Sequence, residues 1–451
     1  MKKNDVCIIS LGCAKNTVDS DSMAQLLGKD GFQLIDSPEK AGVVIVNTCG
    51  FIGDAKDESY STLQDLTAHK HKGQLIVAAG CLTQRYRQEV SRQIHGIDGM
   101  LGTRRWMDIV QVVRALRSQK TPEPLYHLPD VPDSSGEVDG ILRAARQAGS
   151  AYIKIADGCR RPCAFCAIPL IKGRAVSRPA ESIIYEAKTL QSAGVKEIVL
   201  IAQDSTDYGS DVGIADGLTR LLEKMTDEVP ELNWIRIMYA YPGYVTDGLI
   251  EVMAARQQIL HYLDIPLQHG HPDTLKRMNR PHNVDWVRKT IIKMRIAMPD
   301  LAIRSTFIVG YPDETENEFQ ALLDFVEELK LDHVGAFPFS FEPGTASESL
   351  GDPVPLEVKQ NRLERLMLLQ ERISMVNNQA LVGKNLDVLV EGVGDGISIG
   401  RSYRDAPEID GMVVIQEELP IGEIIPVRID GAMVHDLTGT VVRQNNGTIN
   451  R

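Results

Sequence analysis

The middle of the chain repeats one pattern six times: a short apolar run, then a stretch with helical periodicity, as at 180–191, 284–298 and 315–329. Alternation of strands and helices implies a parallel sheet with helices packed against it. Six units are fewer than the eight that close a complete barrel. The repeat therefore predicts an open (β/α)6 barrel over residues 145–376. Its six strands are expected to begin at Ala151, Lys196, Asn233, His261, Leu301 and Leu331. The alternative is a complete eight-stranded barrel with two strands that the pattern does not reveal.

The segment before the barrel also alternates apolar strands with amphipathic helices. Residues 1–124 are predicted to form a Rossmann-like domain with a parallel sheet. Its strands should be short and buried on both faces, because each is a run of β-branched residues. Residues 125–144 are rich in Pro, Asp, Ser and Gly and are predicted to be a linker. The strands are expected at 6–10, 43–47 and 75–79.

The last segment changes character. Short alternating strands with Gly turns over residues 379–447 predict a small all-β barrel, and a long helix over 356–376 should lead into it. The fold class is therefore α/β with an added β-module.

Composition excludes several classes of protein. The first apolar run is too short for a signal peptide or a membrane anchor, so we expect a cytoplasmic protein without membrane contact. Seven cysteines cannot all pair, and clustered thiols in a reducing compartment are more often metal ligands or catalysts than disulfides. The net charge of −12 argues against a broad nucleic-acid footprint and favours a basic protein partner.

The segment DGCRRPCAFCAIP contains Cys159, Cys163 and Cys166 in a C-x3-C-x2-C pattern directly after the first barrel strand. Three thiolates can hold three irons of a 4Fe-4S cluster and leave the fourth iron open to a substrate or cofactor. The alternatives are a zinc turn or three inert buried thiols. A zinc turn is disfavoured because the segment lacks paired C-x2-C knuckles and a fourth ligand.

A second set of cysteines is dispersed. Cys13, Cys49 and Cys81 each follow an apolar strand immediately, and the carboxyl ends of parallel strands line one crevice, so we expect them to converge. The neighbouring Gly12, Gly50 and Gly80 would allow close approach of a bulky inorganic group or merely permit tight turns. The alternative is three buried free cysteines. Within the first strand, Cys7 is expected to be a core thiol.

With both cysteine sets considered, the whole chain resembles the methylthiotransferase branch of the radical S-adenosylmethionine (radical SAM) enzymes. The C-x3-C-x2-C motif is the signature of that superfamily, and the dispersed N-terminal cysteines and a C-terminal TRAM barrel are marks of the branch. Further similar segments are VLIAQDS, LDIPLQHGH and FIVGYPDET. The resemblance implies two 4Fe-4S clusters, one that cleaves S-adenosylmethionine and an auxiliary one, on Cys13, Cys49 and Cys81, that carries sulfur. One S-adenosylmethionine would donate the methyl group and a second would supply the 5′-deoxyadenosyl radical.

The resemblance also suggests contacts to S-adenosylmethionine, although no catalytic side chain beyond the cluster ligands is singled out. Phe165 matches the aromatic residue that lies against adenine in the superfamily, or it is plain packing. Gly310, in GYPDE, follows the fifth barrel strand, where a turn can meet the cofactor or simply reverse the chain. Gln203 and Asp204 should face the barrel mouth. His269 and His271 are expected to be polar contacts and not metal ligands.

Two substrates are known for the branch: an adenosine in transfer RNA, and the β-carbon of an aspartate in ribosomal protein S12. From Gly383 to Arg451 the β-module has eleven acidic and six basic residues, a net charge of −5. An RNA-binding module should be basic, whereas an acidic one would attract a basic ribosomal protein. We therefore favour S12, unless the charges form only a solvated surface.

The alternatives are the transfer RNA enzyme, acting on N6-isopentenyladenosine, and two kinds of protein without this catalysis. These are an iron-sulfur RNA-binding or assembly factor and an electron-transfer protein. The enzymatic interpretation requires two further partners, an electron donor such as flavodoxin or ferredoxin and a source of sulfur.

Overall fold

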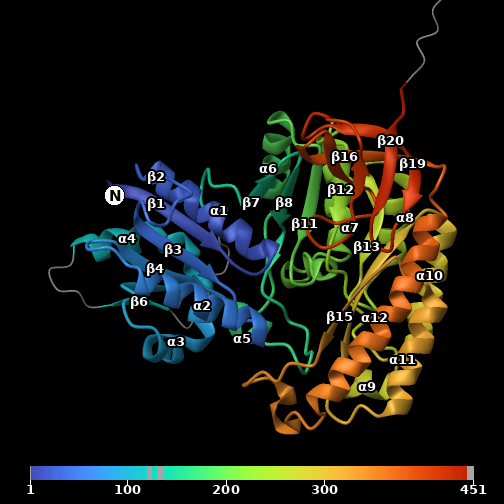
Figure 1. The fold of residues 1–451 in the computed structure, drawn as a ribbon, viewed down its shortest axis with the longest axis horizontal. Coiled ribbons are helices and arrows are strands. Elements are labelled where there is room, and N and C mark those ends of the chain that lie inside the picture. The colour runs from blue at the N-terminus through green and yellow to red at the C-terminus, as the bar shows by residue number, and fades with distance from the viewer. Residues whose placement is uncertain (1, 119–123, 129–136, 444–451) are drawn as a thin grey trace, which may run out of the picture.

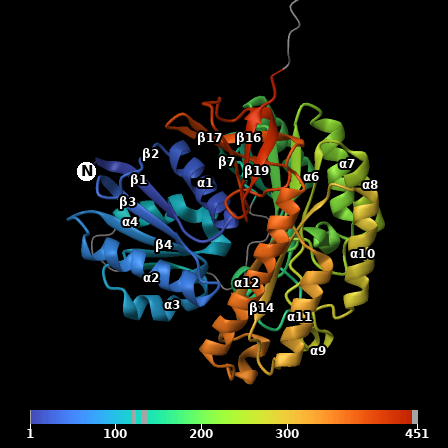
Figure 2. The same cartoon turned by 45° about the vertical axis from the view of Figure 1, so that its right-hand side comes forward.

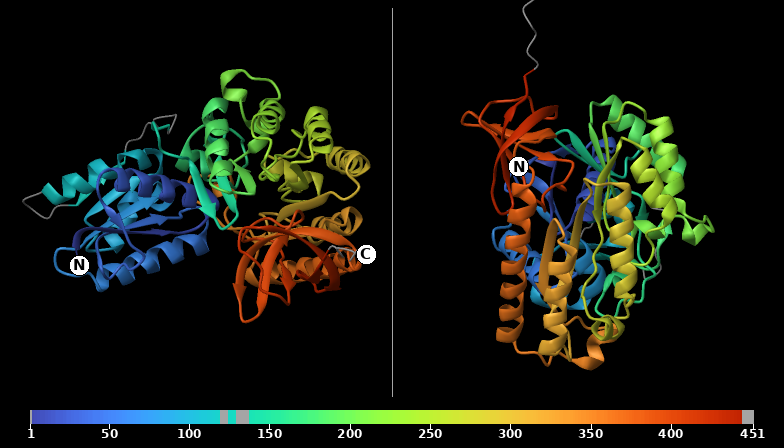
Figure 3. Two further views of the ribbon diagram at one scale, coloured as in Figure 1. Left: turned by 90° about the horizontal axis from the view of Figure 1, so that it is seen from above. Right: turned by 90° about the vertical axis from the view of Figure 1, so that its right-hand side faces the viewer.

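The computed structural model describes residues 2–118, 124–128 and 137–443, and it contains three units in chain order (Figures 1 and 2). The N-terminal unit lies beside the open barrel, and the C-terminal barrel lies against one end of it (Figure 1). Viewed from above, the helices coloured green to yellow line one side of the central strands, and the red C-terminal unit lies on the other side (Figure 3).

The N-terminal unit is a parallel sheet in the order β2-β1-β3-β4-β5-β6, as the apolar runs predicted. Alternate residues of each strand face opposite layers of helices, because successive side chains of a strand point to opposite faces. Ile45 packs with α1 and α4, whereas Val44 packs with α2 and α3. Strand β6 belongs to this sheet, although its residues fall in the segment 125–144 that was predicted to be a linker. Residues 129–136 of that segment lie outside the described residues. The elements are β1 (Lys2–Ser10), α1 (Ala14–Lys29), β2 (Gln33–Leu34), β3 (Ala41–Thr48), α2 (Gly53–Ala68), β4 (Leu75–Gly80), α3 (Cys81–Gln93), β5 (Gly99–Gly102), α4 (Ile109–Ser118) and β6 (Leu125–His127).

The central unit contains the six expected parallel strands in sequential order, and its sheet stays open. One strand of this sheet was not expected: β7 pairs antiparallel with β8 at the edge. Its hairpin turns through Ala148, a non-glycine residue with a φ of 43°, so the turn has no Asn-Gly or Asp-Gly signal. The strands are β7 (Ala144–Gln147), β8 (Ser150–Lys154), β11 (Glu197–Ile201), β12 (Trp234–Ile237), β13 (Ile259–Asp264), β14 (Ala302–Val309) and β15 (His333–Pro338).

Helices pack on the outer face of these strands, where the largest apolar core lies. The long helix α12 leads out of this unit toward the β-module, as its periodicity predicted (Figure 2). The elements are β9 (Ala156–Asp157), α5 (Ile168–Lys172), β10 (Val176–Ser177), α6 (Ala180–Ser192), α7 (Gly217–Glu228), α8 (Asp247–Ala255), α9 (Pro272–Arg277), α10 (Val284–Ala297), α11 (Glu316–Leu329) and α12 (Leu356–Gln379).

The C-terminal unit is a closed barrel in the order β16-β17-β18-β20-β19. It confirms the small all-β barrel that the short alternating strands predicted, and β20 completes the closure between β18 and β19. The end of the predicted module, residues 444–447, lies outside the described residues. The strands are β16 (Asn385–Gly394), β17 (Ile397–Ser402), β18 (Val413–Ile415), β19 (Ile424–Ala432) and β20 (Leu437–Val441).

The small barrel covers part of the inner face of the open barrel. Leu389 and Ala406 pack against inner-face side chains such as Tyr262. Beside them, the buried Glu197 accepts hydrogen bonds from Arg236 of β12, at 2.7 Å, and from Arg401 of β17, at 2.6 Å. A buried carboxylate is tolerated here because two guanidinium groups compensate its charge.

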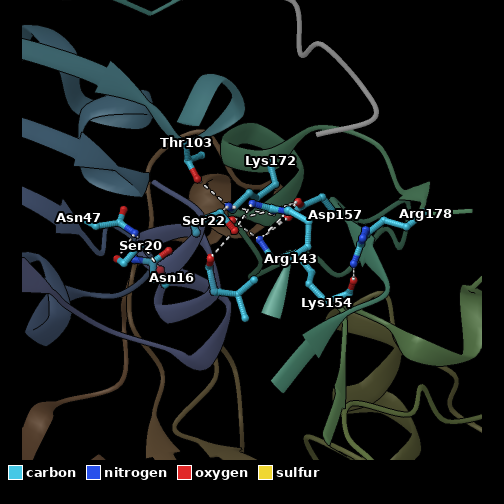
Figure 4. Close-up of polar contacts among 12 residues, drawn as sticks. Asn16, Ser20, Ser22, Asn47, Thr103, Arg143, Lys154, Asp157, Lys172 and Arg178 are labelled. Carbon is cyan, nitrogen blue, oxygen red and sulfur yellow. Dashed lines mark hydrogen bonds and ion pairs between the residues drawn. The ribbon is translucent and has the colours of Figure 1, made fainter. Parts of the chain in front are cut away.

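Helix α1 joins the N-terminal unit to the barrel through Asp19. The carboxylate of this buried residue accepts hydrogen bonds from Lys154 Nζ at 2.5 Å, Arg143 Nη2 at 2.7 Å and Lys172 Nζ at 3.0 Å. Figure 4 shows the three basic side chains converging. Burial alone would raise the pKa of Asp19, but the three cations outweigh it and hold that pKa far below its usual range.

Replacing Asp19 with Asn should therefore destabilise the protein by about 3–5 kcal/mol, because it leaves buried cations uncompensated. Urea unfolding followed by tryptophan fluorescence measures this, since Trp106 lies 4.1 Å from the guanidinium of Arg143. Asp30→Asn is a matched control, because Asp30 pairs at the surface with Arg114 and should cost less than about 1 kcal/mol. Equal effects of the two changes would contradict the role of Asp19.

The pH dependence of the Asp19→Asn effect has a definite sign. A carboxyl whose pKa is lowered in the folded state contributes its full stability above its unfolded pKa, about 3.9, and loses it as the pH falls toward the folded value. The difference in unfolding free energy between wild type and Asp19→Asn should be constant at neutral pH and narrow below about pH 4. A difference that grows in acid would contradict this assignment.

Candidate active site

The sheet brings the strand ends that carry Cys13, Cys49 and Cys81 together. Strands β1, β3 and β4 are neighbours, and Thr48 is in register with Gly80, so Cys49 and Cys81 leave the sheet side by side. Cys13 caps the start of α1. The loops of Cys13 and Cys49 touch: a Cβ on Gly12 would come within 2.9 Å of Cys49 Sγ. At this position glycine is required both by this contact and by a φ of +91°.

The three thiols differ in exposure. Cys13 is exposed, whereas Cys49 and Cys81 are buried. Burial raises the pKa of Cys49 to about 11 and that of Cys81 to about 12. The ammonium of Lys172 acts in the opposite direction and lowers the pKa of Cys81, so this cation favours negative charge at the site.

Cys159, Cys163 and Cys166 lie in the loop that follows β9, at the carboxyl end of the barrel. Hydrogen-bond donors point at two of the sulfurs: the Arg161 backbone N–H lies 3.4 Å from Cys159 Sγ, and Arg280 Nη1 lies 3.5 Å from Cys163 Sγ. Burial raises the pKa of Cys159 to about 11 and that of Cys166 to about 12.

Aromatic and cationic side chains surround Cys163. The hydroxyl of Tyr241 lies 3.6 Å from its sulfur, and the guanidinium of Arg280 lies 4.2 Å from the Tyr241 ring. Arg161 is 3.6 Å from the ring of Tyr244 and also pairs with a buried carboxylate. This half of the site therefore offers positive charge and hydrogen-bond donors to sulfur ligands.

Helix α5 connects the two cysteine sets. It begins two residues after Cys166, and Cys81 packs against Ala167 and Ile171 in one small apolar cluster. Arg104 of the N-terminal unit donates to the carbonyl of Ile171 at 2.7 Å. Cys81, a buried member of the N-terminal cysteine set, thus lies directly beside the segment that follows Cys166.

The residues predicted to contact S-adenosylmethionine have the following surroundings. Phe165 is half-buried and packs with Tyr311 of the GYPDE turn. Asp204 is buried and accepts a hydrogen bond from Arg161 Nε at 2.6 Å. Gln203 precedes it after β11 and is partly exposed. Gly310 has a φ of +70°, and a Cβ there would come 2.4 Å from Lys359.

The two histidines have structural partners. His271 caps α9, where its Nδ1 accepts from the backbone of Asp273. The buried His269 accepts from the backbone of His271 and lies 3.7 Å from Glu314. Glu314 also accepts from the backbone N–H of Gly310 at 2.8 Å, so it fixes the GYPDE turn.

The chemistry of the donor sets fits iron-sulfur clusters. Across the described ranges, no group of three His, Cys, Asp or Glu side chains is close enough to hold a single metal ion. The ligands of a four-iron cluster occupy separate corners of a cube and lie further apart than ligands of one ion. Each set supplies three thiols, all on loops except Cys81, which begins α3. Hydrogen-bond donors that stabilise thiolate sulfur surround Cys159 and Cys163.

Sequence reasoning missed the charged and aromatic residues around the two sets. Arg161 stands inside the cysteine motif, and Lys15 follows Cys13 by two positions, but no role was predicted for either side chain. Tyr241 and Arg280 come from distant segments of the barrel. Their positions depend on the packing of distant loops, so no local signal identifies them.

Comparison with known families agrees with the three units. The Radical SAM superfamily model matches residues 153–326, the TRAM domain model matches 382–442, and the uncharacterized protein family UPF0004 matches 5–102. Two structures of the radical S-adenosylmethionine methyltransferase TsrM from Kitasatospora setae share the fold. Their TM-scores are 0.54 and 0.55 at 12% and 13% identity, and the matches cover 88% and 87% of this chain and 81% and 79% of theirs. The fold and the cysteine motif together define a radical SAM enzyme.

The sequences of curated relatives show which family of radical SAM enzymes includes this chain. The ribosomal protein uS12 methylthiotransferase RimO of Chloroflexus aurantiacus is 46% identical, with 96% of this chain and 98% of the relative covered. The protein of the same name from a Roseiflexus species is 44% identical, with 98% and 99% covered. The chain belongs to the RimO family of radical SAM methylthiotransferases. None of its described helices is long and apolar enough to cross a membrane.

The thiols should differ in reactivity toward iodoacetamide at neutral pH. In metal-free protein, the exposed Cys13 should be alkylated first, and the buried Cys49 and Cys81 should react much more slowly because burial raises their pKa. Loading with iron and sulfide should then protect Cys13. Peptide mass spectrometry measures each site, and the buried core thiol Cys7 is the internal control, because loading should not change its rate. Unchanged alkylation of Cys13 after loading would contradict a cluster there.

The hydroxyl of Tyr241 should raise the reduction potential of a cluster on Cys163, because a hydrogen bond to a thiolate stabilises the reduced, more negative state. Tyr241→Phe should lower the midpoint potential by about 20–60 mV, the equivalent of one modest hydrogen bond. Redox titration followed by electron paramagnetic resonance measures it. Tyr244→Phe is the control, since it keeps the ring against Arg161. Equal potentials in both variants would rule out this contact.

Proposed function

We propose that this chain methylthiolates the β-carbon of an aspartate in the small-subunit ribosomal protein uS12, with one 4Fe-4S cluster on each cysteine set. The observation that carries this proposal is the contact of Cys81 with Ala167 and Ile171, next to Cys166. This contact supports a single active site to which both cysteine sets contribute. The names of the relatives, which are uS12 methylthiotransferases, support the substrate.

In this proposal, each half of the site has a separate task. Cys159, Cys163 and Cys166 hold the cluster that binds S-adenosylmethionine, and together these groups supply a radical able to remove hydrogen from an unactivated carbon. Phe165, Gln203, Asp204 and Gly310 are the candidate contacts for S-adenosylmethionine. Cys13, Cys49 and Cys81 hold the group that carries sulfur.

Surface charge supports a basic protein substrate. In the β-module, Arg401 and Arg404 are buried, and so are the side chains of Asp405 and Asp410, so equal numbers of opposite charges are withdrawn from the surface. The remaining residues of the module therefore still carry a net charge of −5. An acidic surface attracts a lysine- and arginine-rich protein and repels RNA.

The reaction requires partners from outside the chain. The one-electron cleavage of a sulfonium needs a reductant of low potential, and we propose a flavodoxin or a ferredoxin. A sulfur donor must also reload the auxiliary site after each transfer.

The test is anaerobic incubation of cluster-loaded protein with S-adenosylmethionine, a reductant, and either uS12 or transfer RNA, followed by mass spectrometry. We expect a methylthio mass increase on one aspartate peptide of uS12, with 5′-deoxyadenosine and S-adenosylhomocysteine as co-products. A mass increase on adenosine would replace the substrate proposal with the transfer RNA reaction. No modification and no 5′-deoxyadenosine would overturn the enzymatic proposal.

Two variants separate the tasks of the cysteine sets. Cys163→Ala should abolish 5′-deoxyadenosine formation. Cys49→Ala should keep it and lose methylthio transfer, because the sulfur carrier is removed while the radical site stays intact. Cys7→Ala, a change of a core thiol, is the control and should keep both activities. Methylthio transfer by a Cys49→Ala protein without auxiliary cluster would refute the carrier role.

A further inference from the structure

Lys15 is a buried cation with no ionic partner. It is the second residue of α1, two positions after Cys13 at the N-cap, and is 6% exposed. No described carboxylate lies within 4.0 Å of its ammonium nitrogen, and none of the described side chains accepts a hydrogen bond from it. Nζ is not one of the completely sealed polar atoms without a partner, so it keeps some contact with solvent. A buried charge without compensation is costly and needs an explanation.

The two carboxylates that act on Lys15 through space, Asp264 and Asp157, already have other partners. Asp264, at the end of β13, accepts from Arg304 Nη1 and from the backbone N–H of Tyr239, each at 3.2 Å. Asp157 accepts from Lys154 and from the neighbouring arginine of the Asp19 network. Neither carboxylate is therefore free to neutralise Lys15.

The barrel presents a flat aromatic surface to this ammonium. Lys15 Nζ lies 3.3 Å from the centre of the Tyr239 ring. Tyr239 follows β12 at its carboxyl end and has a φ of +62°, a backbone conformation that costs free energy for a residue other than glycine. Such strain is concentrated at ligand-binding positions. The ring holds the ammonium in place without neutralising its charge.

We propose that Lys15 binds the carboxylate of the substrate aspartate, with Tyr239 as the opposite wall of this subsite. The inference rests on the proposed function and deepens it. The β-carbon of an aspartate is bonded directly to its carboxyl carbon, so anchoring the carboxylate fixes the carbon that is modified. Lys15 is two residues from Cys13, and it faces the carboxyl ends of the barrel strands, where the other cysteine set lies. A carboxylate bound here would therefore lie close to Cys13, on the side of α1 that faces the barrel.

A thermodynamic cycle of binding constants tests the proposal independently of turnover. The probes are uS12 and a uS12 variant in which the modified aspartate, located by mass spectrometry, is replaced by asparagine. Cluster-loaded wild-type protein should bind uS12 about 10- to 100-fold more tightly than the asparagine variant, as expected for a desolvated charge-assisted contact. Lys15→Met should bind both probes with the weaker affinity. Calorimetry in the absence of S-adenosylmethionine measures binding without reaction.

The control is Lys29→Met, which removes the same charge from the other end of α1, where Lys29 donates to the carbonyl of Gly140. It should keep the wild-type preference for aspartate. If Lys15→Met still prefers aspartate as strongly as wild type, the proposal is wrong.

The alternative role of Lys15 is to neutralise the auxiliary cluster. That role predicts loss of iron from Lys15→Met, or an altered cluster spectrum, with equal loss of affinity for both probes. Our proposal predicts normal iron content. It also predicts equal or higher thermal stability, because an uncompensated buried charge is replaced by an apolar side chain of similar length. A strongly destabilised Lys15→Met would instead assign Lys15 a structural role.

The failure of this inference can be distinguished from failure of the proposed function. If wild-type protein does not methylthiolate uS12, the proposed function fails whatever the binding constants are. If it does so and Lys15→Met retains the aspartate preference, only the carboxylate subsite is refuted. Lys15→Arg, which keeps the charge, should partly restore the preference, which a purely steric role of Lys15 would not explain.

Discussion

Three positive charges meet on the carboxylate of Asp19, and this contact determines how the two cysteine sets face each other. Asp19 is less than two helical turns from the start of α1, which Cys13 caps. Lys172 is the last residue of α5, which follows Cys166. A short and rigid path therefore joins the two sets. Because the ionic groups are buried, a shift of α1 along the barrel would separate charges in a medium of low dielectric constant.

The two halves of the site differ in how they are built. The N-terminal cysteines follow from the topology of a parallel sheet, because adjacent strands end at the same edge. The barrel cysteines lie on a loop and need surrounding donors to fix them, which Arg161, Tyr241 and Arg280 provide. Burial raises the pKa of the thiols in both halves, and a metal is what makes buried thiolates favourable.

The sequence allowed the order of the units, the six barrel strands and the convergence of Cys13, Cys49 and Cys81 to be predicted, because periodicity and strand topology are local or nearly local properties. It did not reveal β7, whose turn is Ala148-Gly149 and lacks the Asn-Gly or Asp-Gly signal of a tight hairpin. Nor did it reveal Asp19 or Lys15. A buried charge and a solvated charge look alike in a sequence, since the difference depends on segments that are far apart in the chain.

That separation in the chain also sets an order of events during synthesis. Arg143, Lys154 and Lys172 follow Asp19 by 124, 135 and 153 residues. The strands that carry the dispersed cysteines are complete at Gly80, so the N-terminal sheet can form while the barrel is still being made. Until Lys172 has emerged from the ribosome, the edge with Cys13, Cys49 and Cys81 is uncovered. The nascent chain thus has an interval in which small groups from solvent can reach these three thiols before the barrel packs against them.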